Sequence, residues 1–176
     1  MAVQIADYNP TWQQAFAHQR DRLTIALQGW LGGPIEHVGS TAVPGLAAKL
    51  IIDIVAPVMS LVEAHRAIPA LAQAGWLFWP SDPNNSWRLW FLRPRPETRT
   101  HHLYLIEHDD PHLGELIVFR DQLRAHAGLR EQYARLKHLL AEEHRHDREA
   151  YTQAKSQFVA NVLSEAGIEP VPRAGR

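Results

Sequence analysis

The segment 35–56 restricts the possible folds of this chain more than any other part of it. Ile35–Val38 predicts a short strand that leads into a turn with the sequence Gly-Ser-Thr at 39–41. Leu50–Ala56 predicts a second, apolar strand, which a single acid, Asp53, interrupts. Because a carboxylate in apolar surroundings needs a hydrogen-bond partner or a metal ion, this segment predicts a polar site beside a sheet.

Helices and further strands surround this segment along the chain. Apolar residues at spacings of three, four and seven predict a helix that starts at Pro10 and reaches Trp30. The remaining predicted elements are a helix over 60–75 with a break near Pro69, strands over 76–79, 87–92 and 101–107, and helices over 113–126, 129–144 and 147–166. This order predicts an α+β (α/β) domain in which helices pack on one face of a mixed or mostly antiparallel sheet.

The length and composition are those of one globular domain. The chain has 176 residues, of which 45% are hydrophobic and 21% are charged, and these values argue against wholesale disorder. We expect a single domain over 1–169, helical over 112–166, followed by a flexible tail over 170–176.

Other features exclude whole classes of function. The absence of cysteine excludes thiolate metal sites and cysteine nucleophiles. A net charge of −1 excludes the strongly basic surface of a dedicated nucleic-acid-binding protein. The N-terminus lacks a basic and then apolar signal segment, and the longest apolar run, over 50–59, is too short to cross a bilayer. We therefore expect a cytoplasmic protein without a membrane segment.

The turn at 39–41 consists of residue types that suit an anion. Gly39 lets the backbone bend tightly, so that amides and the hydroxyl groups of Ser40 and Thr41 can face a phosphate group. Asp53 would then hold a magnesium ion together with phosphate oxygens. The alternative is that Gly39 and Ser40 merely cap a helix while Asp53 bonds to nearby backbone, and the residues alone favour neither.

Histidines lie close to both parts of this candidate site. On the last predicted strand, His102 and Tyr104 share one face and His101 lies on the other. If the face of His102 meets Asp53, its imidazole is a candidate metal ligand or general base, and the alternative is a surface or hydrogen-bonded pair of histidines. His37, beside the turn, is a candidate phosphate ligand or a satisfied core histidine.

Basic and tyrosine side chains on the C-terminal helices are further candidates. Three pairs have a spacing of four residues, which places each pair on one helical face: Arg120 with Arg124, Tyr133 with Lys137, and Tyr151 with Lys155. Arginine and lysine side chains there can bind phosphate oxygens, and Lys49, four residues before Asp53, can do the same. The alternative for these pairs is a solvated charged face, and for Lys49 an ammonium that reaches out into solvent.

Longer motifs extend over most of the chain. They read DYNPTW at 7–12, EHVGSTAVPGLAAK at 36–49, IIDI at 51–54, RTHHLY at 99–104, FRDQLR at 119–124, YARLK at 133–137 and DREAYTQAK at 147–155. These motifs resemble the GrpB-like family of predicted nucleotidyltransferases, from about Val3 to Ala166. The resemblance implies a nucleotidyltransferase-like fold, a small mixed sheet flanked by helices. It also favours an anion-binding role for the candidates on the C-terminal helices that lie in the motifs, namely Arg120, Lys137, Tyr151 and Lys155.

One position departs from the wider nucleotidyltransferase pattern. In nucleotidyltransferases generally, the strand after the Gly-Ser turn carries two acids separated by one residue, so that both project from one face and hold two metal ions. Here the second position is Val55. The GrpB-like pattern itself lacks this acid, so the resemblance implies one magnesium ion, or none, rather than two.

From the residues and the resemblance together we expect a nucleotidyltransferase that moves a nucleotidyl group from a nucleoside triphosphate to a small acceptor. Asp53 and His102 are the expected catalytic residues and magnesium ligands. The expected nucleotide- and phosphate-binding residues are His37, Gly39, Ser40, Thr41, Lys49, Arg120, Lys137, Tyr151 and Lys155. The alternatives are a non-catalytic module that binds a nucleotide or phosphometabolite, and a phosphate-ester or cofactor-metabolism enzyme on the same fold.

Overall fold

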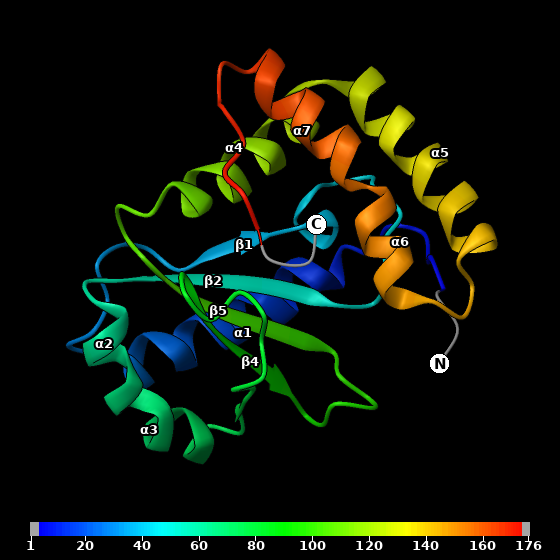
Figure 1. Cartoon of the computed structure of the whole chain (residues 1–176). Coiled ribbons are helices and arrows are strands. Elements are labelled where there is room, and N and C mark those ends of the chain that lie inside the picture. The colour runs from blue at the N-terminus through cyan, green and yellow to red at the C-terminus, as the bar shows by residue number, and fades with distance from the viewer. Residues whose placement is uncertain (1–3, 174–176) are drawn as a thin grey trace.

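The computed structural model describes residues 4–173, except for the side chain of Arg148. Helices and strands follow one another in nearly the predicted order (Figure 1). Their bounds are α1 Thr11–Ala26, β1 Glu36–Val38, β2 Ile52–Val58, α2 Leu61–Ala64, α3 Ile68–Gln73, β3 Leu77–Phe78, β4 Arg88–Arg93, β5 His101–Glu107, α4 Pro111–Ala125, α5 Ala127–Glu143, α6 Arg148–Ala154 and α7 Ser156–Glu165, with 3₁₀ turns at Ser40–Ala42 and His65–Ala67.

The strands form one mixed sheet in the order β1-β2-β5-β4-β3. The two central strands, β2 and β5, run parallel, and the other three neighbouring pairs are antiparallel. The predicted mixed sheet of an α+β domain is therefore confirmed. The register of the parallel pair places Asp53 directly opposite His102, which brings two residues separated by 49 positions into contact.

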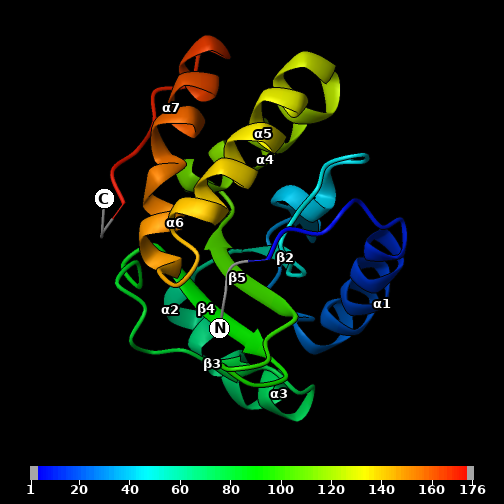
Figure 2. The same ribbon diagram turned by 90° about the vertical axis from the view of Figure 1, so that its right-hand side faces the viewer.

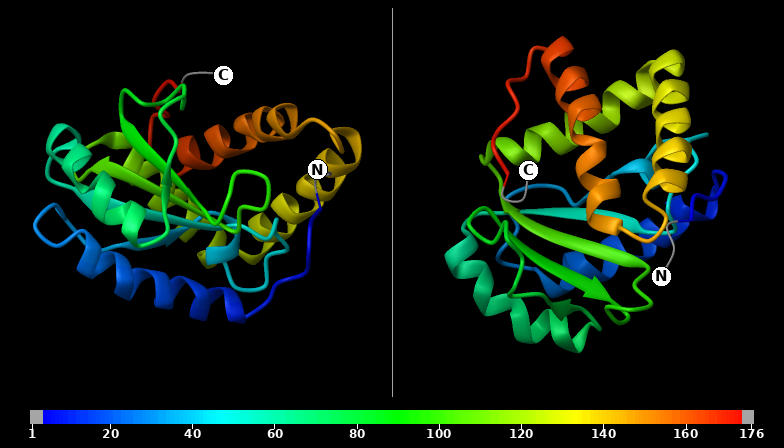
Figure 3. Two further views of the ribbon diagram at one scale, coloured as in Figure 1. Left: turned by 90° about the horizontal axis from the view of Figure 1, so that it is seen from below. Right: turned by 45° about the vertical axis from the view of Figure 1, so that its right-hand side comes forward.

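Helices cover both faces of this sheet, and the expectation of helices on one face alone is wrong. Ile54 and Leu103 belong to a core cluster that includes residues of α1 and α3, while Val55 belongs to a second cluster that includes Leu113 of α4. Successive side chains of a strand point to opposite faces, and Ile54 and Val55 are both fully buried, so each face needs its own cover. Figure 3 shows α1 along one side of the sheet and α6 and α7 along the other.

The C-terminal helices cluster on the α4 side of the sheet, away from α1 and α3 (Figure 2). Leu123 of α4 and Tyr133 of α5 pack with Val43 and Leu46, which follow the first 3₁₀ turn. These contacts hold α5 against the loop between β1 and β2. Within residues 4–173, no helix combines the length and the apolar character that crossing a membrane requires.

Two predicted helices are interrupted in the structure. The predicted break near Pro69 is confirmed, because a 3₁₀ turn separates α2 from α3 and the proline lies in the first turn of α3. The helix predicted over 147–166 is in fact two helices, which end and begin on either side of Lys155.

The start of the predicted flexible tail is tied to α4. The backbone amide of Val171 and the guanidinium of Arg173 both donate to the buried carboxylate of Glu115. Nε2 of His112 also lies 3.2 Å from the carbonyl oxygen of Pro172. These contacts tie residues 171–173 to α4, because a buried acid on α4 needs donors. The flexibility of the tail stays a prediction. Residues 174–176 of the predicted tail lie outside the described residues.

Candidate functional site

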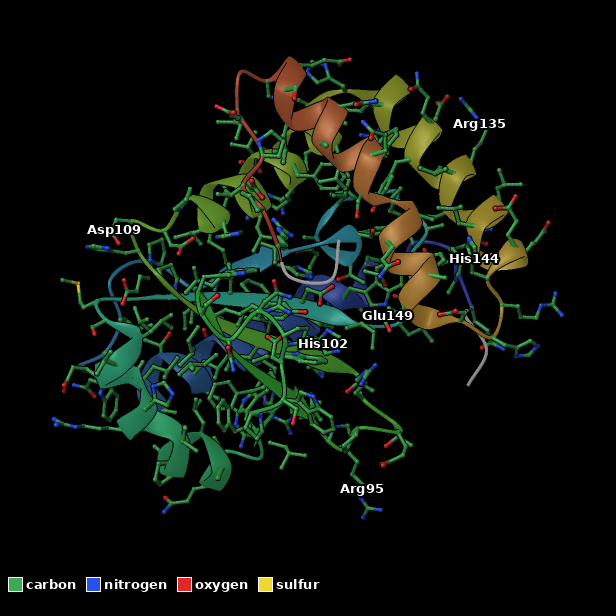
Figure 4. The ribbon with its side chains drawn as sticks, in the orientation of Figure 1. Arg95, His102, Asp109, Arg135, His144 and Glu149 are labelled. Carbon is green, nitrogen blue, oxygen red and sulfur yellow. The ribbon has the colours of Figure 1, made fainter. Side chains whose placement is uncertain are left out.

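A cavity of about 600 Å³ lies on the face of the sheet that carries Asp53. Figure 4 shows His102 on the sheet and Glu149 on α6, the helix that faces this part of the sheet. The lining residues are Ser40, Thr41, Lys49, Ile51, Asp53, Asp82, Pro83, Asn84, Arg88, Trp90, Arg99, His102, Tyr104, Lys137, Glu149, Tyr151, Thr152 and Lys155. The cavity therefore joins the turn after β1, the central strands and the C-terminal helices.

The bend at Gly39 brings the turn against the carboxylate of Asp53. Gly39 has φ 71° and ψ −173°, a backbone conformation that is essentially restricted to glycine. A Cβ atom at this position would lie 2.7 Å from Oδ2 of Asp53, which is closer than a real Cβ contact. The missing side chain thus allows the bend and the acid to approach each other, and Ser40 follows directly at the start of the 3₁₀ turn.

Two side chains of β5 hold the other carboxylate oxygen of Asp53. Nδ1 of His102 lies 3.1 Å from Oδ1 of Asp53, and the hydroxyl of Tyr104 lies 3.5 Å from the same oxygen. A carboxylate oxygen only accepts hydrogen bonds, so Nδ1 of His102 donates. Asp53 keeps 28% of its side chain exposed, and its Oδ2 accepts no hydrogen bond from the described residues, so this oxygen is available to a ligand.

His102 is placed to orient Asp53 rather than to act as a base. Its Nδ1 is engaged with the carboxylate, and its Nε2 is buried without a hydrogen-bond partner in the described part of the chain. Neither nitrogen is therefore directed at the open cavity. The same geometry argues against His102 as a magnesium ligand, because the nitrogen nearest to Asp53 carries the proton of their hydrogen bond.

The carboxylates of the cavity do not form a complete magnesium site within the described residues. No group of three or more histidine, aspartate or glutamate side chains within the described residues is arranged to hold a metal ion. Val55, at the position of the missing second acid, is fully buried in the core. A magnesium ion at Asp53 would need its other ligands from phosphate oxygens and water, as magnesium commonly does.

The wall opposite Asp53 is cationic. Lys137 of α5 is 2% exposed, and its ammonium donates to the backbone carbonyl oxygen of Ala47. Burial, and secondarily the charge of Lys155, lowers the pKa of Lys137 to about 7. Burial likewise lowers the pKa of Lys155 to about 8, although the charge of Asp53 opposes this shift.

Tyr151 of α6 connects the lysines of this wall. The ammonium of Lys49 lies 3.6 Å from the centre of the Tyr151 ring, and that of Lys155 lies 4.3 Å from it. Cations at these distances are attracted to the electron-rich ring face. The aromatic ring thereby holds two ammonium groups at one end of the cavity.

The lowered pKa of Lys137 predicts that stability rises with pH. Between about pH 7 and 9.5 the unfolded chain binds a proton at this lysine that the folded protein does not, so the free energy of unfolding should rise by up to about 1.4 kcal/mol per pH unit. Chemical denaturation at several pH values measures this slope, and Lys137→Met should flatten it. Arg135→Met, on the same helix with an exposed side chain, is the control. An unchanged slope in Lys137→Met would contradict the burial of a charge there.

Polar and aromatic side chains of β4 and its preceding loop form the remaining wall. Nε and Nη2 of Arg88 donate to the two carboxylate oxygens of Asp82 at 2.6 and 3.0 Å. The guanidinium of Arg88 lies 4.8 Å from the centre of the Tyr104 ring. The Arg88 guanidinium, fixed by this bidentate pair, contacts Tyr104, which in turn contacts Asp53.

Comparison with known proteins places the chain in a family. The model of the family described as GrpB protein matches residues 2–165. The chain belongs to the GrpB family. It is 39% identical over 169 residues to the UPF0157 protein PA4798 of Pseudomonas aeruginosa, covering 93% of this chain and 67% of that relative.

Two other relatives are similar to the chain over nearly their whole length. The chain is 31% identical over 166 residues to the glutamate-rich protein GrpB of Alkalihalophilus pseudofirmus, covering 93% of this chain and 95% of the relative. The crystal structure of the conserved protein GrpB from Enterococcus faecalis superimposes with a TM-score of 0.81 at 26% identity, covering 93% of this chain and 96% of that one. The GrpB resemblance predicted from the motifs is thus confirmed.

Most of the predicted site residues of this GrpB chain meet at the cavity, but two do not. Those that line it are Ser40, Thr41, Lys49, Asp53, His102, Lys137, Tyr151 and Lys155, and Gly39 packs against Asp53. His37 is 3% exposed, stacks on Phe16 and bonds to Thr41 Oγ1 at 3.0 Å, while burial lowers its pKa to about 4. His37 therefore has the geometry of a satisfied core histidine.

Arg120 connects α4 to β1 outside the cavity. Its Nη1 donates to Glu36 at 2.6 Å and to the backbone oxygen of His37 at 3.0 Å, and its Nε donates to Asp121 at 2.8 Å. These contacts leave the guanidinium fully engaged within the protein. The geometry thus favours a structural role for Arg120 over phosphate binding.

Some residues that line the cavity were not predicted from the sequence. Asp82 and Asn84 lie in a turn-rich loop, and their residue types are ordinary in turns. Arg88 is one of fifteen arginines, and only the fold places it at the cavity, whereas Arg99 belongs to the motif at 99–104. Glu149, Thr152 and Lys155 follow one another at a spacing of three, so helical spacing relates Glu149 and Thr152 to the predicted Lys155 once α6 is known to face the cavity.

Proposed function

We propose that this GrpB chain binds a nucleoside triphosphate in the cavity and transfers its nucleotidyl group to a small acceptor. The observation that carries the proposal is that a partly exposed carboxylate, Asp53, faces the same cavity as Ser40 and three lysines. The volume of about 600 Å³ is within the range of small-molecule and cofactor sites. Family membership alone does not decide the activity.

Each group has a place in the proposed reaction. The acceptor oxygen attacks the α-phosphorus, the bond from this phosphorus to the bridging oxygen breaks, and pyrophosphate leaves. Lysine ammonium groups counter the negative charge that develops on the leaving group. His102 and Tyr104 hold the Asp53 carboxylate through Oδ1, so that Oδ2 would face the α-phosphate, and the acceptor proton passes to water. Magnesium, when bound with the triphosphate, supplies Lewis-acid polarisation of the phosphate oxygens, and Asp53 would be its protein ligand.

A transfer assay tests this proposal. Purified protein is incubated with magnesium, each of the four nucleoside triphosphates labelled at the α-phosphate, and a panel of alcohols, amines, sugar phosphates and proteins as acceptors. We expect the label to move to one class of acceptor with release of an equal amount of pyrophosphate. Binding of the triphosphates without transfer to any acceptor would contradict the catalytic part of the proposal.

A second candidate function is a non-catalytic module that binds a nucleotide or phosphometabolite. The buried Val55 favours it, since the second acid that two-metal transfer chemistry uses is replaced by a core residue. This candidate predicts saturable binding at the lysine wall without turnover. The transfer assay, run beside calorimetry with the same triphosphates, separates the two candidates.

A further inference from the structure

The lysines of this chain are distributed in an unusual way. The sequence contains 18 lysine and arginine residues, and the only lysines among them are Lys49, Lys137 and Lys155. All three line the cavity, although they come from the loop before β2, from α5 and from the junction of α6 and α7. Every other basic position of the chain is an arginine. The three lysines therefore share one place in the fold, beside Arg88 and Arg99, which also line the cavity.

The two cations differ in shape and in how they tolerate burial. An ammonium is a compact charge that can lose its proton when buried, whereas a guanidinium is planar and stays charged. Lys137 is almost completely buried, and its partner is a neutral carbonyl oxygen rather than a carboxylate. Neither Lys137 nor Lys155 forms an ion pair with a carboxylate within the described residues. The ammonium groups of these two lysines are thus not paired with a carboxylate in the described part of the chain, although Asp53, Asp82 and Glu149 line the same cavity.

We propose that the three lysines bind the diphosphate end of a nucleotide directly, with no metal ion between their ammonium groups and these phosphates. This inference rests on the proposed function for the identity of the ligand and adds the way in which its charge is neutralised. The second acid that would hold a second metal ion is absent at Val55, and the ammonium groups are present in the same cavity. The positive charge of the three lysines then neutralises the phosphates in place of the second metal ion.

The arrangement suits a chain of phosphates better than a single phosphate. Three separate elements each contribute one ammonium, and the Tyr151 ring lies within 4.3 Å of two of them. Ser40 adds a hydroxyl to the same wall. One tetrahedral phosphate offers few oxygens to donors on three elements, whereas a diphosphate offers several along its length.

Binding should also take up protons near neutral pH. Lys137 is faced by Lys155 from the α6–α7 junction, by the Tyr133 ring of its own helix at 4.9 Å, and by the Ala47 carbonyl, with Asp53 across the cavity. An anion beside it stabilises the protonated ammonium, since opposite charges favour the charged form. The measured binding enthalpy at pH 8 should therefore depend on the ionisation enthalpy of the buffer.

Calorimetry with inorganic pyrophosphate tests the inference on the whole chain. The titration is done at pH 8 in EDTA, in two buffers of different ionisation enthalpy, and repeated with inorganic orthophosphate. We expect pyrophosphate to bind without metal and more tightly than orthophosphate. Lys137→Met and Lys155→Met should each weaken it by about 10- to 100-fold, as for one charge-assisted hydrogen bond, and Lys137→Met should also lessen the buffer dependence.

The matched control is Arg135→Met, which removes one positive charge from α5 on the side that points away from the sheet (Figure 4). It should change the affinity less than about 2-fold, because an exposed charge is screened by solvent. Equal losses in Arg135→Met and Lys137→Met would overturn the inference, and so would binding that requires magnesium. Thermal denaturation of each variant without ligand shows that it is folded.

The outcomes also separate this inference from the proposed enzyme activity. Pyrophosphate binding in EDTA together with no nucleotidyl transfer would support the lysine site and refute catalysis. Transfer activity together with no pyrophosphate binding in EDTA would support catalysis and refute the metal-free site. Orthophosphate binding as tight as pyrophosphate binding would overturn the diphosphate assignment.

Discussion

Gly39→Ala is expected to lower the free energy of unfolding by about 1–3 kcal/mol and to weaken pyrophosphate binding by at least about 10-fold. The backbone at φ 71° and ψ −173° is strained for any residue with a side chain. The added Cβ would also lie 2.7 Å from Oδ2 of Asp53, so the bend would be displaced, and with it the Ser40 hydroxyl that lines the phosphate site. Chemical denaturation and calorimetry measure the two effects.

Gly29→Ala is the matched control for this variant. Gly29 also has a positive φ, 93°, but a Cβ atom there would meet nothing within 4 Å. This control should therefore lose stability through backbone strain alone and keep its affinity for pyrophosphate. If Gly39→Ala bound pyrophosphate as well as Gly29→Ala does, the close approach of the bend to Asp53 would have no role in the site.

Asp53→Asn is expected to reduce the rate of nucleotidyl transfer by about 100- to 1,000-fold, the usual effect of losing one charged group at the reacting atoms. The amide keeps the shape of the side chain and can still bond to His102 and Tyr104, so the fold should be retained. Triphosphate binding in EDTA should not weaken, because the variant removes a negative charge from an anion site. Single-turnover kinetics with the acceptor found in the transfer assay measure the first effect.

Glu149→Gln provides the control for charge. This acid lines the same cavity but lies on α6, at an exposed position. It should alter the transfer rate by less than about 3-fold, since an exposed charge contributes little. Equal losses of transfer rate in Asp53→Asn and Glu149→Gln would mean that the rate depends only on the total charge of the cavity. The position of the Asp53 carboxylate would then have no role.

The local part of the site could be predicted from the sequence because it depends on periodicity. Alternation along a strand places His102 and Tyr104 on one face, and a glycine before Ser40 predicts a tight bend. The parallel pairing that sets Asp53 opposite His102 could not be predicted, since nothing in either strand specifies its neighbour or register. The resemblance to the GrpB-like family was the reason to consider Asp53 and His102 as parts of one site.

Residues that depend on long-range packing were harder to assign. Arg120 reads as a phosphate ligand by type and motif, yet its partners Glu36 and the His37 carbonyl come from β1, more than eighty positions away. The break at Lys155 has no glycine or proline to signal it. Helical spacing nevertheless placed Lys155 beside Tyr151, because the two short helices keep that pair together.

The most direct test of the central claim is a crystal structure of the protein with a non-hydrolysable nucleoside triphosphate. We predict that the β- and γ-phosphates contact Lys137 and Lys155, and that the α-phosphate lies beside the carboxylate of Asp53. Phosphates bound elsewhere on the protein, with the lysine wall empty and Asp53 touching no part of the ligand, would contradict the assignment of this cavity.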